Sequence, residues 1–162
     1  MKNKLVLEII YELGWFAFAA VAAYLLVLPV VPKISSALYL YMYGTLFLIV
    51  TFFRFTAFLS HSVLLENVFV KILLFIVNVP LFFYLLNEYY TYGRVFDNYD
   101  YTLASNIFQH IKSGTELEDL TYIKKLVTFC GIASLMLVVL LQVRIVYALF
   151  KLRQLDKYLV RN

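Results

Sequence analysis

Two histidines, His61 and His110, are the side chains of this sequence best suited to acid–base chemistry or metal binding near neutral pH. Neither has an Asp, Glu, Cys or His at a spacing that would place a second metal ligand on the same helix face. Phosphate-binding Gly-rich loops and nucleophile-elbow motifs are also absent from the sequence. We therefore predict no catalytic residue, no metal site and no cofactor. An integral membrane enzyme, which would have to use His61 or Glu66 at the membrane surface, ranks last among the functions considered.

A second group of polar side chains lies within long apolar stretches: Thr45, Thr51, Asn78, Thr128, Ser134 and Gln142. In a membrane protein, a hydrogen bond to the backbone or to a neighbouring helix accounts for each of them. Pro80 removes one backbone hydrogen bond and predicts a kink, with Asn78 beside it as a partner for a freed backbone group. The alternative is that Asn78, Pro80 and Gln142 line a path through the membrane between copies of the chain.

Small residues form two patches that predict close approach of helices, within one chain or between copies. Ala19 and Ala23 have small-xxx-small spacing, and Cys130, Gly131 and Ser134 form a similar patch later in the chain. Cys130 is the single cysteine, so an intramolecular disulfide is excluded. Because a chain of this size buries little core of its own, we expect a homo-oligomer.

The segment 88–125 is the only sizeable part predicted to lie outside the membrane on the external side, and it begins with many Tyr and acidic residues. Tyr is expected where helices meet lipid headgroups. A recognition surface is the functional alternative, because Tyr offers a large contact area with little loss of entropy. The candidate external recognition residues are Tyr89, Tyr90, Tyr92, Arg94, Phe96, Tyr99 and Tyr101. Residues 103–112 have the apolar spacing of a short helix lying on the membrane.

The last part of the chain predicts one long helix. Thr115 and Glu118 fit a capping box, and no Pro follows, so a helix from Glu116 to about Leu159 would be roughly 65 Å long. Its end, residues 144–162, is basic and amphipathic. This tail is interpreted either as a docking helix for a partner or sister subunit, or as a basic helix on anionic lipid. The candidate partner-docking residues are Lys151, Leu152, Arg153, Leu155, Lys157, Leu159 and Arg161.

The composition requires a membrane to hold these elements. The chain is 64% hydrophobic and 15% charged, whereas soluble domains are nearer half apolar and a quarter charged. Uncharged stretches close to the roughly 20 residues that cross a bilayer predict four spans, at about residues 13–32, 34–53, 67–87 and 126–143. The expected fold class is an all-α, integral membrane four-helix protein. Residues 1–162 are expected to form a single domain whose first two spans make an antiparallel hairpin.

Lys and Arg positions near the span ends predict that both termini face the cytoplasm, with the long last helix extending into it. The expected localisation is the cell membrane, specifically a bacterial inner membrane. The net charge of +4 is spread over the span ends rather than gathered on one face, so direct binding of nucleic acid is not expected. The expected partners are membrane lipid, further copies of the chain and a cytoplasmic protein.

This layout of a short four-span chain with a compact external segment and a basic cytoplasmic end resembles the membrane subunit of Kiwa, a two-component bacterial anti-phage system. The resemblance covers the architecture of the whole chain and includes no matched motif residues. It implies an oligomeric membrane sensor that works with a cytoplasmic DNA-binding partner. The functional hypothesis is therefore a small membrane sensor or scaffold that oligomerises and recruits a cytoplasmic partner. A pore-forming or transporter subunit is the alternative.

Overall fold

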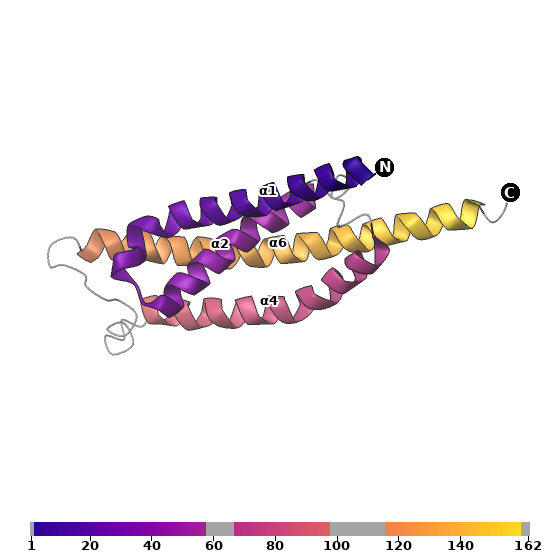
Figure 1. Cartoon of the computed structure of the whole chain (residues 1–162). Coiled ribbons are helices and arrows are strands. Elements are labelled where there is room, and N and C mark those ends of the chain that lie inside the picture. The colour runs from indigo at the N-terminus through magenta and orange to yellow at the C-terminus, as the bar shows by residue number, and fades with distance from the viewer. Residues whose placement is uncertain (1, 58–66, 98–115, 160–162) are drawn as a thin grey trace.

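The computed structural model describes residues 2–57, 67–97 and 116–159, and this part of the chain is all helical apart from short connections. Four long helices are each long and apolar enough to cross a membrane, which confirms the predicted all-α, four-helix membrane fold. The elements are α1 (Lys2–Val27), a short 3-10 helix η1 (Leu28–Lys33), α2 (Ser36–Ala57), α4 (Val68–Asp97) and α6 (Glu116–Leu159) (Figure 1).

Each predicted window overlaps one span of the structure. The windows 13–32 and 126–143 lie within their spans, whereas 34–53 and 67–87 begin one or two residues before theirs, and all four spans are longer than predicted. These spans are Ile9–Lys33, Ser36–Ala57, Val68–Phe96 and Leu120–Lys151. The helices continue past the uncharged windows because a helix satisfies the hydrogen bonds of its own backbone, which lipid cannot do. The prediction of one uninterrupted helix from Glu116 to Leu159 is confirmed, and that helix has 44 residues.

Local sequence signals set the turn and two helix starts. Pro29 and Pro32 lie in η1, which reverses the chain so that α1 and α2 form the predicted antiparallel hairpin. The backbone N–H of Leu38 donates to Ser35 Oγ at 3.3 Å, as expected of an N-cap serine before α2. At the start of α4, Asn67 Oδ1 accepts a hydrogen bond at 2.9 Å from the backbone N–H of Phe69, two residues later.

Helix α6 occupies the centre of the bundle and packs against both α2 and α4, while α1 packs mainly against α2. Figure 1 shows that α1 begins and α6 ends at the same end of the bundle. We call this the terminal end and the opposite one the distal end. Helix α4 continues through Pro80 and curves along its length in Figure 1, in the way that an internal proline predicts.

Two apolar clusters hold the helices together, one in each half of the bundle. The distal cluster contains Ala23, Val27, Val30, Ile34, Leu38, Tyr41, Met42, Leu46, Tyr92, Ile123, Val127 and Cys130. The terminal cluster contains Phe52, Phe55, Leu85, Val138, Leu141 and Ile145. Hydroxyl groups within the spans bond to their own helix: Thr45 to Tyr41 at 2.7 Å, for example, and Ser134 to Gly131 at 3.0 Å. The predicted backbone role of these two polar side chains is thereby confirmed.

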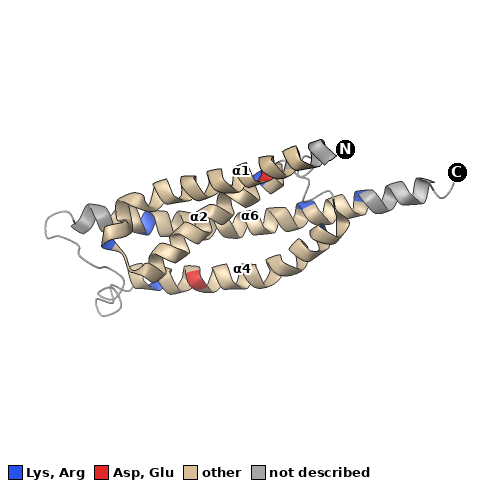
Figure 2. Ribbon diagram, in the orientation of Figure 1, with Lys and Arg blue, Asp and Glu red and all other residues tan. Residues whose placement is uncertain are grey.

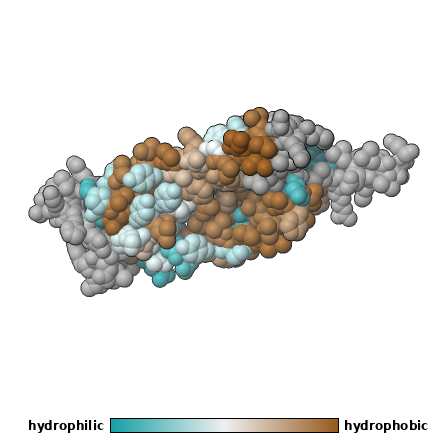
Figure 3. All heavy atoms as spheres, viewed as in Figure 1, coloured by the Kyte–Doolittle hydropathy of each residue, from teal (hydrophilic) through white to brown (hydrophobic). Residues whose placement is uncertain are grey.

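The outer surface of the bundle is apolar over most of its length. Figure 3 shows hydrophobic residues over the middle of the visible face, and paler, more polar residues gathered toward the distal end. In Figure 2, the charged residues of the described ranges lie toward the two ends of the bundle and leave its middle free of charge. In α6, for example, the 18 uncharged residues 126–143 cover about 27 Å, close to the hydrocarbon core of about 30 Å.

Candidate functional site

The terminal half of the bundle contains a buried ion pair between α1 and α2. Arg54 Nη1 donates to Glu12 Oε2 at 2.5 Å, and the two side chains are 9% and 7% exposed. Three aromatic rings surround the guanidinium, whose Cζ lies 5.7 Å from the ring centroid of Tyr11, 5.4 Å from that of Trp15 and 5.9 Å from that of Phe55. These distances are within the range of cation–π attraction. The charge of Arg54 is therefore both neutralised by a carboxylate and covered by rings.

Two side chains of α6 extend this connection to the remaining helices. Arg144 Nη2 donates to the carbonyl oxygen of Ala57, the last residue of α2, at 3.4 Å. A cation at a helix C-terminus is favoured by the exposed carbonyls and by the helix dipole. Gln142 Nε2 donates to the carbonyl oxygen of Phe75 in α4 at 2.9 Å. We call the three contacts Glu12–Arg54, Ala57–Arg144 and Phe75–Gln142 the polar clamp; they join α1 to α2, α2 to α6 and α6 to α4.

Sequence reasoning missed the polar clamp, although one signal could have found its first contact. Glu12 precedes the first uncharged window, and Arg54 follows the second. An antiparallel hairpin of two spans brings those two positions to the same end of the bundle, where opposite charges would pair. The prediction of spans used the two residues only as the limits of uncharged stretches and did not consider that they could pair.

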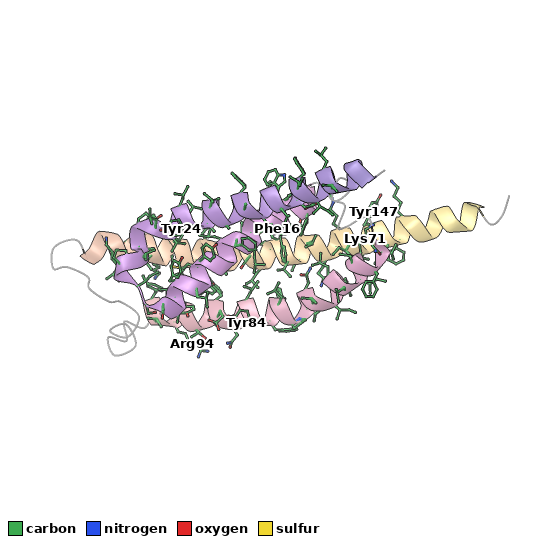
Figure 4. The ribbon with its side chains drawn as sticks, viewed as in Figure 1. Phe16, Tyr24, Lys71, Tyr84, Arg94 and Tyr147 are labelled. Carbon is green, nitrogen blue, oxygen red and sulfur yellow. The ribbon has the colours of Figure 1, made fainter. Side chains whose placement is uncertain are left out.

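Further basic residues lie at the terminal end. Lys71, near the start of α4, is almost fully buried, while Lys151 on α6 is exposed. Figure 4 shows Lys71 and Tyr147 toward the terminal end and Arg94 at the distal end. The terminal end thus combines the polar clamp with additional positive charge next to the point where α6 leaves the bundle.

Asn78 lies in the interior of the terminal half with 0% exposure, and neither atom of its amide has a hydrogen-bond partner among the described residues. Leu74, Leu81 and Leu85 lie on the same face of α4 and pack into the terminal cluster. Gln142 donates to the carbonyl oxygen of Phe75, which lies about one turn of α4 before Asn78. The side-chain oxygen of Gln142, Oε1, is buried without a hydrogen-bond partner in the described ranges.

The structure therefore brings two of the three candidate pore residues, Asn78 and Gln142, into the region where α4 packs against α6. The third residue, Pro80, is exposed on the outside of α4. The three residues consequently do not share one surface of the chain.

The candidate recognition residues divide between the interior and the outside of the distal half. The ring of Tyr89 packs directly on Gly131 of α6, so closely that a Cβ at Gly131 would overlap it. Tyr92 is 8% exposed, and its ring centroid lies 4.8 Å from that of Tyr41 in α2. Phe96 packs partly against the distal cluster. These three aromatic side chains join α4 to its neighbours.

Tyr90 and Arg94, in contrast, point away from the bundle, and Tyr90 is 57% exposed. All the candidate recognition residues from Tyr89 to Phe96 belong to the last turns of α4. Tyr99 and Tyr101 lie outside the described residues. The short helix predicted at 103–112 also lies outside them. Within the described ranges, the outward-facing candidates are Tyr90 and Arg94.

The small-residue patches lie at helix contacts within the chain. Ala19 and Ala23 are both buried, and Ala23 belongs to the distal cluster together with Cys130. Gly131 provides the room for Tyr89, as described above. These patches bring α1 close to α2, and α6 close to α4, inside one copy of the protein.

The candidate docking residues lie at the end of α6. Lys151 is exposed, whereas the side chains of Leu152, Arg153, Leu155, Lys157 and Leu159, in the last turns of α6, fall outside the described part. Arg161 lies outside the described residues, as do His61, Glu66 and His110. In the ranges that the structure describes, no three His, Cys, Asp or Glu side chains are grouped closely enough to hold a metal ion. No protein family, curated protein or solved structure matches the chain.

Proposed function

We propose that the protein is a small membrane scaffold or sensor that oligomerises and holds a cytoplasmic protein partner on the end of α6. The observation that carries this proposal is the length of α6. Its 44 residues span about 66 Å at 1.5 Å per residue, whereas the hydrocarbon core of a bilayer is about 30 Å thick. The candidate span ends at Lys151, and the helix continues without a break to Leu159. We call residues 152–159 the α6 arm.

The polar clamp supports this proposal because two of its contacts hold α6 shortly before the α6 arm. Gln142 ties α6 to α4, and Arg144 ties it to α2. A continuous helix fixed at these two points transmits its orientation to the arm. On this proposal, a change in the packing of α4 or α2 would reach a bound partner as a movement of the arm.

The positions of the basic residues support a cytoplasmic location for the terminal end. Lys2, Lys4, Arg54, Arg144 and Lys151 all belong to that end, and positive residues favour the cytoplasmic side of a membrane. This orientation would put the exposed Tyr90 and Arg94 on the outside, as a surface for sensing. The architectural resemblance to the Kiwa membrane subunit supports extending the proposal to anti-phage defence at a bacterial inner membrane.

A photo-reactive residue placed on the α6 arm tests whether a partner binds there. The sequence puts Leu152, Leu155 and Leu159 on one face of the helix and Arg153 and Lys157 on others. We expect the photo-reactive residue to form a covalent adduct with one soluble protein when it replaces a Leu. The adduct yield should be several-fold higher at these positions than at Arg153 or Lys157. The measurement is the yield and mass of adducts after irradiation of intact cells.

The control is a chain shortened to residues 1–151, which removes the arm but keeps the candidate spans and the polar clamp. It should insert into the membrane like the full chain and should co-purify none of the soluble protein. Adducts formed only with lipid would contradict the proposal and favour a helix on the membrane surface. Adducts formed only with a second copy would show that the arm joins subunits instead of holding a partner.

A second candidate function, a pore or transporter subunit, is favoured by Asn78. A fully buried amide without hydrogen bonds costs about 1–3 kcal/mol, and such groups near the middle of a membrane often serve transport. Gln142 lies in the same packed region, and its buried Oε1 has no hydrogen-bond partner in the described part of the chain.

Replacing Asn78 by Leu separates the two functions. The scaffold proposal predicts that neither the wild type nor Asn78→Leu conducts ions across the membrane of proteoliposomes. It also predicts that Asn78→Leu raises the free energy of unfolding by about 1–3 kcal/mol, since two unpaired polar atoms leave the core. The pore candidate predicts flux through the wild type and less flux through Asn78→Leu. Ser134→Ala is the matched control, because Ser134 is equally buried but already hydrogen-bonded.

A further inference from the structure

A groove of about 690 Å³ runs along one face of α6 toward the distal end. Its described lining comes entirely from α6, with residues spaced three and four apart on one side of the helix. The lining residues are Thr121, Lys124, Lys125, Thr128, Phe129, Ile132, Ala133 and Met136. The groove lies within the candidate membrane span of α6, Leu120–Lys151, and Phe129, Ile132 and Met136 of its lining are exposed on the outside of the bundle.

The lining changes from polar to apolar along the helix. Thr121, Lys124 and Lys125 are exposed at the end nearer the distal surface. Phe129 and Met136, further along, are 54% and 61% exposed, with no polar side chain between them in the lining. One end of the groove therefore suits an anion, and the other suits a hydrocarbon chain.

The length of the groove matches one leaflet of a bilayer. Met136 lies twelve residues after Lys124, which corresponds to about 18 Å along the helix axis. Half of the hydrocarbon core is about 15 Å thick. With the two lysines at headgroup level, the groove thus ends close to the middle of the membrane. The uncharged stretch of α6 begins at Leu126, directly after the two lysines, which agrees with this depth.

We propose that this groove binds an anionic glycerophospholipid of the distal leaflet. The headgroup phosphate would lie against the ammonium groups of Lys124 and Lys125, and one acyl chain would follow Phe129, Ile132 and Met136. Two lysines attract a headgroup with net negative charge more than a zwitterionic one. A water-soluble anion would leave the apolar half of the groove unfilled. This inference is independent of the α6 arm and of any cytoplasmic partner.

The test is lipid retention by the full chain in neutral detergent, measured by native mass spectrometry. The probe is an equimolar mixture of phosphatidylglycerol and phosphatidylcholine with identical acyl chains. We expect the wild type to retain phosphatidylglycerol roughly tenfold more than phosphatidylcholine, because each basic residue adds to the attraction. Lys124→Gln/Lys125→Gln should lose this preference, and Ala133→Trp, which fills the groove, should reduce retention of both lipids.

The control Arg94→Gln/Lys151→Gln also removes two exposed positive charges, one at each end of the bundle, and should keep the preference. Equal loss in this control would overturn the proposal, because net charge alone would then explain the binding. Equal retention of the two lipids by the wild type would also overturn it, whether or not the variants fold. A third contrary result is stabilisation by inorganic phosphate alone that matches stabilisation by phosphatidylglycerol.

Discussion

Replacing Glu12 by Gln should lower the free energy of unfolding by about 3–5 kcal/mol, because it leaves the buried charge of Arg54 without its carboxylate. The surrounding rings of Tyr11, Trp15 and Phe55 attract the guanidinium but do not neutralise it. The loss should appear as a lower midpoint in a detergent unfolding titration followed by circular dichroism. Because the ion pair joins α1 to α2, we expect α1 to separate from the bundle first.

Two further variants show whether the effect comes from the unpaired charge. Glu12→Leu/Arg54→Leu removes both charges and should recover most of the lost stability, since apolar replacements of a whole buried pair are often close to neutral. Glu88→Gln changes a half-buried glutamate at the distal end and should change stability by less than about 1 kcal/mol. A Glu12→Gln protein as stable as the wild type would mean that the ion pair does not hold the hairpin together.

The second large effect is expected at Gly131. Substitution by Ala puts a methyl group where the ring of Tyr89 lies, so α4 and α6 must move apart or the ring must leave its position. Overpacking of this kind costs about 1–3 kcal/mol. Unfolding of Gly131→Ala, measured in the same titration, should therefore begin at a lower detergent concentration than unfolding of the wild type.

Gly44 provides a matched control, because an added Cβ there meets no atom within 4 Å. Gly44→Ala should be neutral or more stable by up to about 1 kcal/mol, since Ala is the better helix former. Adding Tyr89→Ala to Gly131→Ala should remove the clash, so that the two changes are coupled by about 0.5–3 kcal/mol. Strictly additive effects would show that Tyr89 and Gly131 do not touch.

The helices could be predicted from sequence because each depends on a local property. The spacing of charges located all four spans, and the unbroken run after Glu116 predicted the full length of α6. Which face of each helix turns inward could not be predicted in the same way. Hydropathy hardly distinguishes the faces of a helix that is apolar all round, so the inward rotation of Asn78 and the outward rotation of Pro80 depend on the packing of neighbouring helices.

The candidate site was predicted less well than the fold for the same reason. Tyr89 and Tyr92 belong to a Tyr-rich segment that was predicted to be an external surface. In the structure they pack against Gly131 of α6 and Tyr41 of α2. The partner-docking role of the α6 arm stays a prediction. The polar clamp joins residues as far apart in sequence as Ala57 and Arg144, and such contacts follow from tertiary structure.

The ion pair has a consequence for biosynthesis. Both of its partners belong to the first 57 residues, so the segment that neutralises Arg54 has already been made when α2 emerges from the ribosome. A lone arginine within a helix makes insertion into a bilayer less favourable. The first hairpin carries the counterion of Arg54 and can enter the lipid with that charge already neutralised, before α4 and α6 have been synthesised.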